Sequence, residues 1–258
     1  MFIDSHTHLY FDNYQNDIES VMARCLENDV QKCVIAGVSS DTIAPIIELC
    51  RQFPNICYPC IGLHPTDVKE NYLEELKIVE EELQKQPYYA VGETGLDYYW
   101  DKTFEKEQKD AFVQQILLAQ KHDLPLIIHS RDAFEDTVEV LEPRIKNQKS
   151  RKKAGVFHCF SGTVEQAKQV IEMGFYIGIG GVVTFKKNQL VDVVKEIDLQ
   201  HIVLETDAPF LAPTPYRGQR NESAYIPIIA QKVAEIKGIS IEEVADITTS
   251  NAEILFGI

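Results

Sequence analysis

Short apolar runs recur along this chain, and segments with helical spacing separate them. Most of the runs are rich in Val and Ile and nearly continuous, rather than alternating apolar with polar residues. Continuous runs are typical of strands that are buried on both faces of a parallel sheet. We therefore expect eight parallel strands, within residues 1–4, 32–38, 56–62, 88–92, 124–128, 154–157, 175–179 and 201–205.

Helical patterns lie between these runs, at residues 104–122 and 163–173, and a final pair of helices is expected at about 223–237 and 240–255. In the acidic segment 74–84 the apolar side chains also have helical spacing, so its acids form a solvated helix face. Its apolar positions are Leu73, Leu76, Val79 and Leu83.

One helix has clear boundary signals. Thr163 stands three residues before Gln166, which is the pattern of a capping box at a helix N-terminus. Gly174 is expected to end the same helix and to lead into the next strand.

The order of these elements favours an α/β fold of the (β/α)8 type, a TIM barrel. Strand and helix alternate eight times, and two helices follow the eighth strand. An open Rossmann-type sheet is the alternative, but no G-x-G-x-x-G motif follows the first run. No linker rich in Gly, Ser or Pro divides the chain, so we expect a single domain over residues 1–258.

Composition and net charge restrict the cellular location of the protein and the partners that it binds. Within its 258 residues no apolar run approaches the roughly 20 residues that cross a bilayer, and no basic stretch precedes an apolar core at the N-terminus. We expect a cytoplasmic protein with no membrane partner. The net charge of −15 argues against non-specific binding along duplex DNA, which needs many Lys and Arg contacts. This charge does not exclude binding of a nucleic-acid end at a local site whose positive charge comes from metal ions.

The six cysteines do not predict disulfides or a structural zinc site, because most lie in or beside strand-like runs. Cys57 and Cys60 form a C-x-x-C, but in a strand context and not at the helix N-terminus that activates a redox pair. No second C-x-x-C accompanies them. We expect small, buried side chains.

Histidines and acids stand at the ends of the apolar runs. His6 and His8 are two residues apart in an extended segment, so their side chains point the same way and suit one ion. In a closed barrel the carboxyl ends of all strands meet at one mouth, where the catalytic centres of this fold lie. The expected metal ligands are His6, His8, Glu93, His129, His158 and Asp207.

This ligand set predicts two cations. Imidazoles and carboxylates suit zinc, manganese, iron or magnesium better than a metal that prefers thiolates. Six ligands exceed what one catalytic ion needs, because such an ion keeps a position open for water. We expect two divalent cations (Mg, Mn or Zn), whose excess of positive charge would attract an anionic substrate. One ion takes His6, His8 and Asp207, the other takes His129 and His158, and Glu93 bridges them.

Asp207 and Glu93 are the expected catalytic residues. Asp207 is a candidate proton acceptor for an attacking water, and its alternative is a helix cap after the strand. For Glu93 the alternative is a salt bridge inside the barrel, because a buried carboxylate needs either an ion or an Arg.

His64 and Arg131 are the expected substrate-binding residues. His64 ends the third run and either binds substrate phosphate or hydrogen-bonds a metal ligand. Arg131 lies two residues past His129, where a guanidinium is able to clamp phosphate; an ion pair with Asp132 or Glu135 is the alternative.

Four other residues are given lesser roles. Arg217 and Arg220 follow the eighth run and either contact substrate or fix that loop, and we favour the second. His122 and His201 do not follow a strand and are interpreted as structural or solvent-facing.

Motifs from the first residues to beyond residue 220 carry a family resemblance. They are DSHTHL at the start, GLHP at 62–65, GETGLDYY at 92–99, IIHSRDA at 127–133, FHCFSG at 157–162, ETDAPFLAP at 205–213 and RGQRNE at 217–222. In this order they resemble the TatD-like metal-dependent hydrolases of the amidohydrolase superfamily. The resemblance implies a (β/α)8 barrel, a divalent-metal site with the same six ligands and, as in many members, deoxyribonuclease activity. Thr94 stands where Ile is more usual and Ser223 where Pro is frequent, and neither is an expected ligand.

The leading hypothesis is a divalent-metal-dependent deoxyribonuclease that acts as a 3′-5′ exonuclease. A barrel mouth suits the end of a single-stranded nucleic acid or a nucleotide better than a continuous duplex, and no obligate protein partner is expected. The alternative is a metal-dependent amide or ester hydrolase such as an aminoacyl-tRNA deacylase, because the same chemistry attacks a carbonyl. A third hypothesis is a non-catalytic barrel that serves as a binding module.

Overall fold

Strands and helices alternate along residues 1–100, 102–145 and 154–258, the parts of the chain that the computed structural model describes. The strands are β1 (Phe2–Thr7), β2 (Val30–Ile35), β3 (Cys57–Pro59), β4 (Val91–Asp97), β5 (Leu126–Arg131), β6 (Gly155–Phe157), β7 (Phe175–Ile179) and β8 (Ile202–Leu204). The helices are α1 (Ile18–Glu27), α2 (Ile43–Gln52), α3 (Tyr72–Glu82), α4 (Glu105–His122), α5 (Phe134–Ile145), α6 (Val164–Glu172), α7 (Leu190–Glu196), α8 (Ile226–Lys237) and α9 (Ile241–Phe256).

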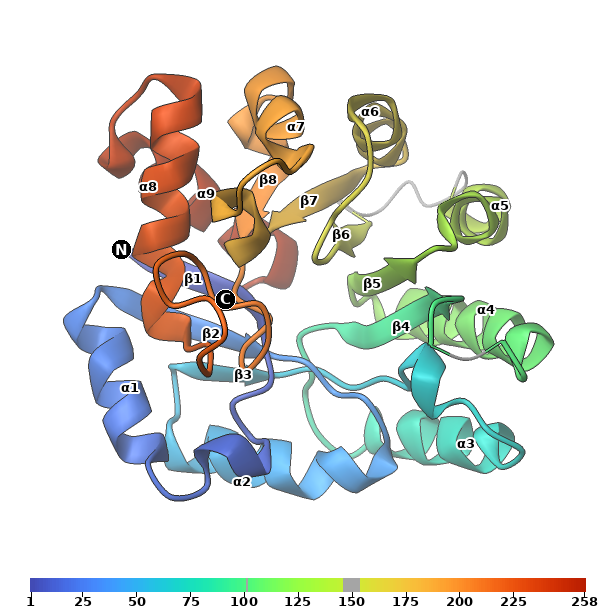
Figure 1. Cartoon of the computed structure of the whole chain (residues 1–258). Coiled ribbons are helices and arrows are strands. Elements are labelled where there is room, and N and C mark those ends of the chain that lie inside the picture. Colours follow the sequence, from blue (N-terminus) through green and yellow to red (C-terminus); the bar gives the residue numbers. More distant parts are fainter. Residues whose placement is uncertain (101, 146–153) are drawn as a thin grey trace.

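The strands form a barrel in two arcs. β1, β2 and β3 are hydrogen-bonded in one arc and β4 to β8 in the other, and all the pairs are parallel. Single bridges close both gaps, Ile61 with Val91 and Thr7 with Ala208. Helices surround the strands, as Figure 1 shows. The (β/α)8 prediction is confirmed, and the Rossmann alternative is wrong because an open sheet would leave two free edges.

The amino-terminal end of the barrel is sealed by α9. Each strand, or a residue next to it, contributes one apolar side chain to a layer inside the barrel, and the last turns of α9 pack beneath this layer. The open end of the barrel is therefore the opposite mouth, at the carboxyl ends of the strands. The layer consists of Ile3, Val34, Cys60, Ala90, Ile127, Val156, Tyr176 and Val203, and α9 adds Ala252, Leu255 and Phe256.

Several sequence-based boundaries need correction. The fourth strand was expected at 88–92 but runs from Val91 to Asp97, because its inward-facing residues are polar and an apolar-run criterion misses them. Glu93 therefore lies inside β4. His6 and His129 also lie inside their strands, β1 and β5. Leu73 was expected on the buried face of its helix but is 53% exposed, since the helix has only begun at Tyr72.

The predicted boundaries of one helix are confirmed. Thr163 and Gln166 form the reciprocal capping box at the start of α6, and Gly174 follows that helix with a φ of 86°. All six cysteines are free. Cys25, Cys33, Cys57 and Cys60 are buried as expected, whereas Cys50 and Cys159 are only half-buried. No helix in the described ranges is both long and apolar enough to cross a membrane.

Gly95 offers a test of how tightly β4 packs against β5. It has a φ of 140°, and a Cβ at this position would overlap the carbonyl oxygen of His129. We expect Gly95→Ala to destabilise the protein by about 3 kcal/mol, because backbone atoms cannot move aside. Gly174→Ala is the control: it also has a positive φ but meets nothing within 4 Å, so about 1 kcal/mol of conformational strain is expected.

Denaturant unfolding of the two variants measures both costs. Equal losses of unfolding free energy would contradict the close approach of the two strands.

Candidate metal centre

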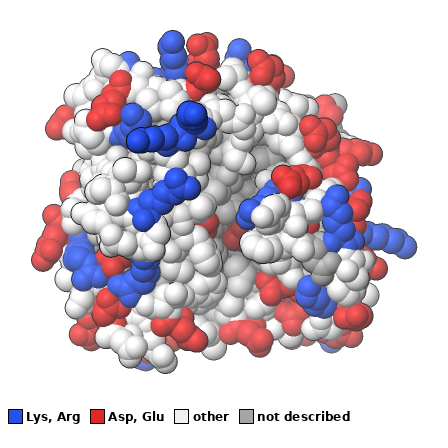
Figure 2. Space-filling model, in the orientation of Figure 1, with Lys and Arg blue, Asp and Glu red and all other residues white. Residues whose placement is uncertain are grey.

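The carboxyl ends of five strands bring the predicted ligands to one place. His6 is near the end of β1 and His8 directly follows it, whereas Glu93 and His129 belong to β4 and β5. His158 follows β6, and Asp207 lies three residues after β8. Figure 2 shows a hollow in the middle of this face, with Lys and Arg side chains on both sides of it.

The glycines of the GETG motif explain how Glu93 reaches its neighbours. A Cβ at Gly92 would lie 2.6 Å from the Cβ of Ile127, and one at Gly95 would overlap the His129 carbonyl oxygen. Both glycines also have positive φ, which other residues rarely adopt. The two strands therefore press together only because side chains are missing here, and this places Glu93 beside His129.

The carboxylate of Glu93 is the centre of the site. It is buried and lies close to five imidazoles, and no Arg pairs with it among the described residues. Its Oε2 lies 3.4 Å from His6 Nε2 and 3.5 Å from His8 Nε2. Its Oε1 lies 2.6, 2.9 and 3.2 Å from His158 Nε2, His129 Nδ1 and His64 Nε2. The two oxygens thus face two different groups of histidines.

Asp207 lies near the first of these groups. Its Oδ1 is 3.6 Å from His6 Nε2 and 3.5 Å from His8 Nε2. The two nitrogens lie 3.2 Å from each other. The ring of His158 stacks on that of His6 with their centroids 4.0 Å apart, so the two groups adjoin.

Hydrogen bonds behind the histidines determine which nitrogen faces the centre. His8 Nδ1 lies 3.2 Å from the carbonyl oxygen of Ala36, which only accepts, so Nδ1 carries a proton. His129 Nε2 lies 2.9 Å from Asp97 Oδ2 and donates to it in the same way. The other ring nitrogen of each histidine then carries a lone pair and faces a carboxylate oxygen. Two lone pairs that face each other repel unless a proton or a cation lies between them.

The pKa directions differ between the histidines. Burial would lower the pKa of His129, but its hydrogen bonds to Asp97 and Glu93 outweigh burial and raise that pKa to about 9. Burial, with the nearby His158, lowers the pKa of His6 to about 4, which leaves its ring neutral. Burial alone would raise the pKa of Glu93, but the surrounding imidazoles outweigh it and hold that pKa well below its ordinary value. A neutral imidazole beside an ionised carboxylate is the donor chemistry that divalent cations require.

Three trios of side chains have ligand atoms within 4.8 Å of one another. They are His6, His8 and Glu93; His6, His158 and Asp207; and His64, Glu93 and His129. Together they contain all six expected ligands and add His64. The donor set therefore fits divalent cations.

Three buried acids that support the ligands were not given roles from the sequence. Asp97 orients His129, and Glu205 lies 3.9 Å from His158 Nδ1 while it accepts the Cys159 N–H. Asp4 accepts the N–H groups of His6 and Thr206. The signal was present in the motifs DSHTH, GLDYY and ETD, where each acid stands one to four residues from a ligand.

The two expected substrate-binding residues have clear neighbours. His64 contacts Glu93 through Nε2 and Thr66 through Nδ1, at 2.6 Å. Arg131 lies over the ring of Tyr99, and within the described residues it forms no ion pair with Asp132 or Glu135.

The other basic side chains near the mouth are held by their own contacts. Arg220 pairs with Asp17 and Glu222, which confirms that it fixes its loop. Arg217 lies over the ring of Phe185.

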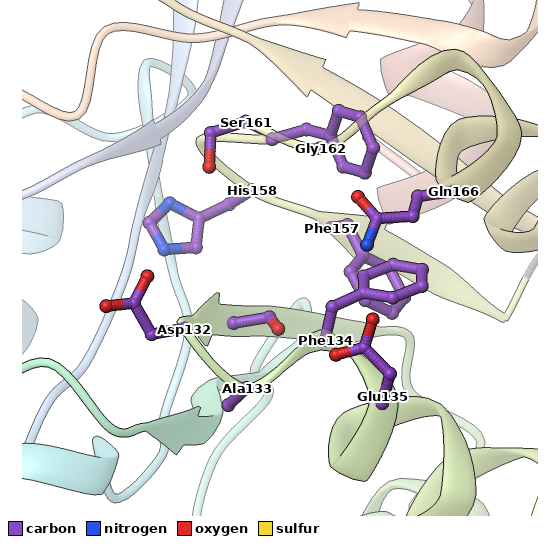
Figure 3. Close-up of a pocket in the computed structure, with 11 residues that line it drawn as sticks. Asp132, Ala133, Phe134, Glu135, Phe157, His158, Ser161, Gly162 and Gln166 are labelled. Carbon is purple, nitrogen blue, oxygen red and sulfur yellow. The ribbon is translucent and has the colours of Figure 1, made fainter.

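A cavity of about 290 Å³ adjoins the centre between the loops that follow β5 and β6. Figure 3 shows His158 and Asp132 at one end and the rings of Phe134 and Phe157 at the other. Gln166 and Glu135 lie beside the two rings, so the cavity combines apolar and polar contacts that would suit part of a substrate.

Comparisons with known proteins agree with this geometry. The family model for TatD related DNase matches residues 3–257. The metal-dependent hydrolase YabD of Bacillus subtilis is 41% identical over 259 residues, which cover 100% of both chains. The 3′-5′ ssDNA/RNA exonuclease TatD of Escherichia fergusonii is 32% identical, over 99% of this chain and 98% of its own length. The crystal structure of YjjV, a TatD homolog from Escherichia coli, superposes with a TM-score of 0.92 at 28% identity, over 100% of this chain and 98% of that one.

The fold and these relatives define a metal-dependent hydrolase on a (β/α)8 barrel. The chain belongs to the TatD-related DNase family.

Asp97 provides a test of how the ligands are oriented. We expect Asp97→Ala to weaken metal binding about 10- to 100-fold, because His129 loses the acceptor that fixes its ring. Asp97→Asn keeps a hydrogen-bond acceptor for His129 and should lose less metal affinity than Asp97→Ala. Calorimetric titration of Mn²⁺ into chelator-treated protein measures the affinities, with Asp110→Asn on the outer helix α4 as control. Wild-type affinity in Asp97→Ala would show that this hydrogen bond does not position His129.

Proposed function

We propose that this protein is a two-cation phosphodiesterase that removes nucleotides from the 3′ end of single-stranded DNA or RNA. The observation that carries the proposal is the buried carboxylate of Glu93, whose two oxygens face two separate groups of histidines. This is the arrangement expected of a carboxylate that bridges two ions.

The assignment of ligands follows the two sides of Glu93. His6, His8 and Asp207 would hold one cation, on the side of the site that Glu93 Oε2 faces. His129 and His158 would hold the other, on the side that Glu93 Oε1 faces. His64 lies on this second side and either adds a ligand or keeps Glu93 in place.

Two divalent cations at such a centre lower the pKa of a bound water and stabilise charge on a displaced oxygen. Asp207 supplies the proton acceptor: its side chain is 15% exposed, whereas that of Glu93 is 4% exposed, so Asp207 is more accessible from the mouth.

The shape and charge of the protein support an end of a single strand as the substrate. The barrel is sealed by α9 and opens at one mouth, so a chain end enters more readily than a continuous duplex. The net charge of −15 opposes binding along duplex DNA, while two cations would attract a phosphate locally. The Escherichia fergusonii relative is named a 3′-5′ ssDNA/RNA exonuclease.

Oligonucleotide digestion tests the reaction and its direction. We expect single-stranded DNA labelled at its 5′ end to give a ladder that shortens from the 3′ end when Mg²⁺ or Mn²⁺ is supplied. A phosphorothioate at the 3′-terminal linkage should delay this ladder. Hydrolysis of acyl esters or aminoacyl-tRNA, with no cleavage of DNA or RNA by metal-loaded protein, would favour the ester-hydrolase hypothesis and overturn this one.

Asp207→Asn tests the proton acceptor. We expect turnover of the oligonucleotide to fall by at least about 100-fold, the scale of general-base catalysis. Metal content must be measured in the same preparation, because Asp207 is also an expected ligand. Unchanged turnover at full metal occupancy would show that another group accepts the proton.

A further inference from the structure

Two large aromatic side chains lie exposed beside the metal centre. Tyr99 is 56% exposed and Trp100 is 67% exposed, and their ring centroids are 5.0 Å apart. Both follow β4, so they belong to a loop at the open mouth of the barrel. Burial in a core does not explain these rings, and the metal centre does not use them.

Arg131 completes this group. Arg131 is the last residue of β5. Its guanidinium carbon lies 4.0 Å from the centroid of the Tyr99 ring and 5.4 Å from the centroid of the Trp100 ring. Aromatic rings with a stacked cation are what proteins use to bind single-stranded nucleic acid, because every base presents a flat face and every nucleotide a phosphate.

The position of these rings is tied to the metal centre through Asp97. One carboxylate oxygen of Asp97 accepts from His129 Nε2 at 2.9 Å. The other accepts the backbone N–H groups of Tyr99 and Trp100 at 2.9 and 3.0 Å. A single buried side chain therefore fixes both an expected metal ligand and the start of the aromatic loop.

We propose that Tyr99 and Trp100 form a stacking platform in which one nucleobase of the substrate strand stacks on the exposed Trp100 ring, that Tyr99, whose plane is 87° from that of Trp100, supports this ring edge-on, and that Arg131 binds a phosphate beside it. The proposal rests on the nuclease function above and names the part of the substrate that lies outside the metal centre. Since stacking needs no particular base, the platform would hold strands of any sequence. Self-association at this surface would bring together two chains that each carry a net charge of −15, whereas the Arg131 guanidinium supplies a local positive charge for a phosphate.

Trp100 is the only tryptophan of the chain, so its fluorescence reports on the platform directly. The probe is a short oligothymidylate with phosphorothioate linkages, which slow hydrolysis during the titration of Mg²⁺-loaded protein. We expect the fluorescence to be quenched as the strand binds. An abasic oligomer of the same length carries the phosphates without the bases, and we expect little quenching from it.

Variants test whether stacking contributes to binding. Trp100→Ala should weaken binding of the oligothymidylate about tenfold, the order of one base–aromatic stack, whereas Trp100→Phe should recover most of the affinity. Fluorescence anisotropy of labelled strands measures these affinities. Leu117→Ala is the matched control, because it removes a side chain that is 53% exposed on α4, away from the mouth.

The outcomes separate this proposal from the nuclease function. DNA cleavage with no quenching, and with equal affinity of wild type and Trp100→Ala, would overturn the platform and leave the function. Quenching by base-containing strands with no cleavage of any nucleic acid would support the platform and overturn the function. Trp100 fluorescence that changes with protein concentration but not with oligonucleotide would assign the rings to self-association and overturn the platform.

Discussion

The site depends on one buried carboxylate that is surrounded by histidines. Glu93 lies within 3.5 Å of five imidazole nitrogens, and its side chain is almost fully buried. A buried charge is costly unless partners compensate for it, and neutral imidazoles do so only with a proton or a cation between them and the carboxylate. The electrostatics of Glu93 and its neighbours are thus suited to the cations that a metal-dependent hydrolase requires.

The barrel makes this arrangement possible by concentrating polar groups at one end. α9 seals the amino-terminal end with apolar side chains, while the opposite mouth collects the carboxyl ends of all eight strands. Gly92 and Gly95 let β4 approach β5 more closely than any side chain would permit. The packing of the scaffold and the chemistry of the site are therefore set by the same backbone contacts.

Asp97 joins two functions that are separate in the sequence. It orients His129 at the metal centre and it anchors the backbone of Tyr99 and Trp100 at the rim. Substrate held on the rim would then lie at a fixed position relative to the ions, which is what efficient catalysis demands. The rigidity comes from burial of Asp97, because its hydrogen bonds do not compete with water.

Local patterns in the amino-acid sequence were sufficient for the order of strands and helices, the barrel, the capping box at Thr163 and the six candidate ligands. They were sufficient because burial on both faces of a strand leaves a continuous apolar run, and because ligands follow such runs at the mouth. The limits of β4, the choice between the two roles open to His64, and the partners of Asp97 and Glu205 emerged only from the folded chain, although both acids stand in the recognised motifs. These features depend on distances between strands far apart along the chain, and no pattern within one segment encodes such distances.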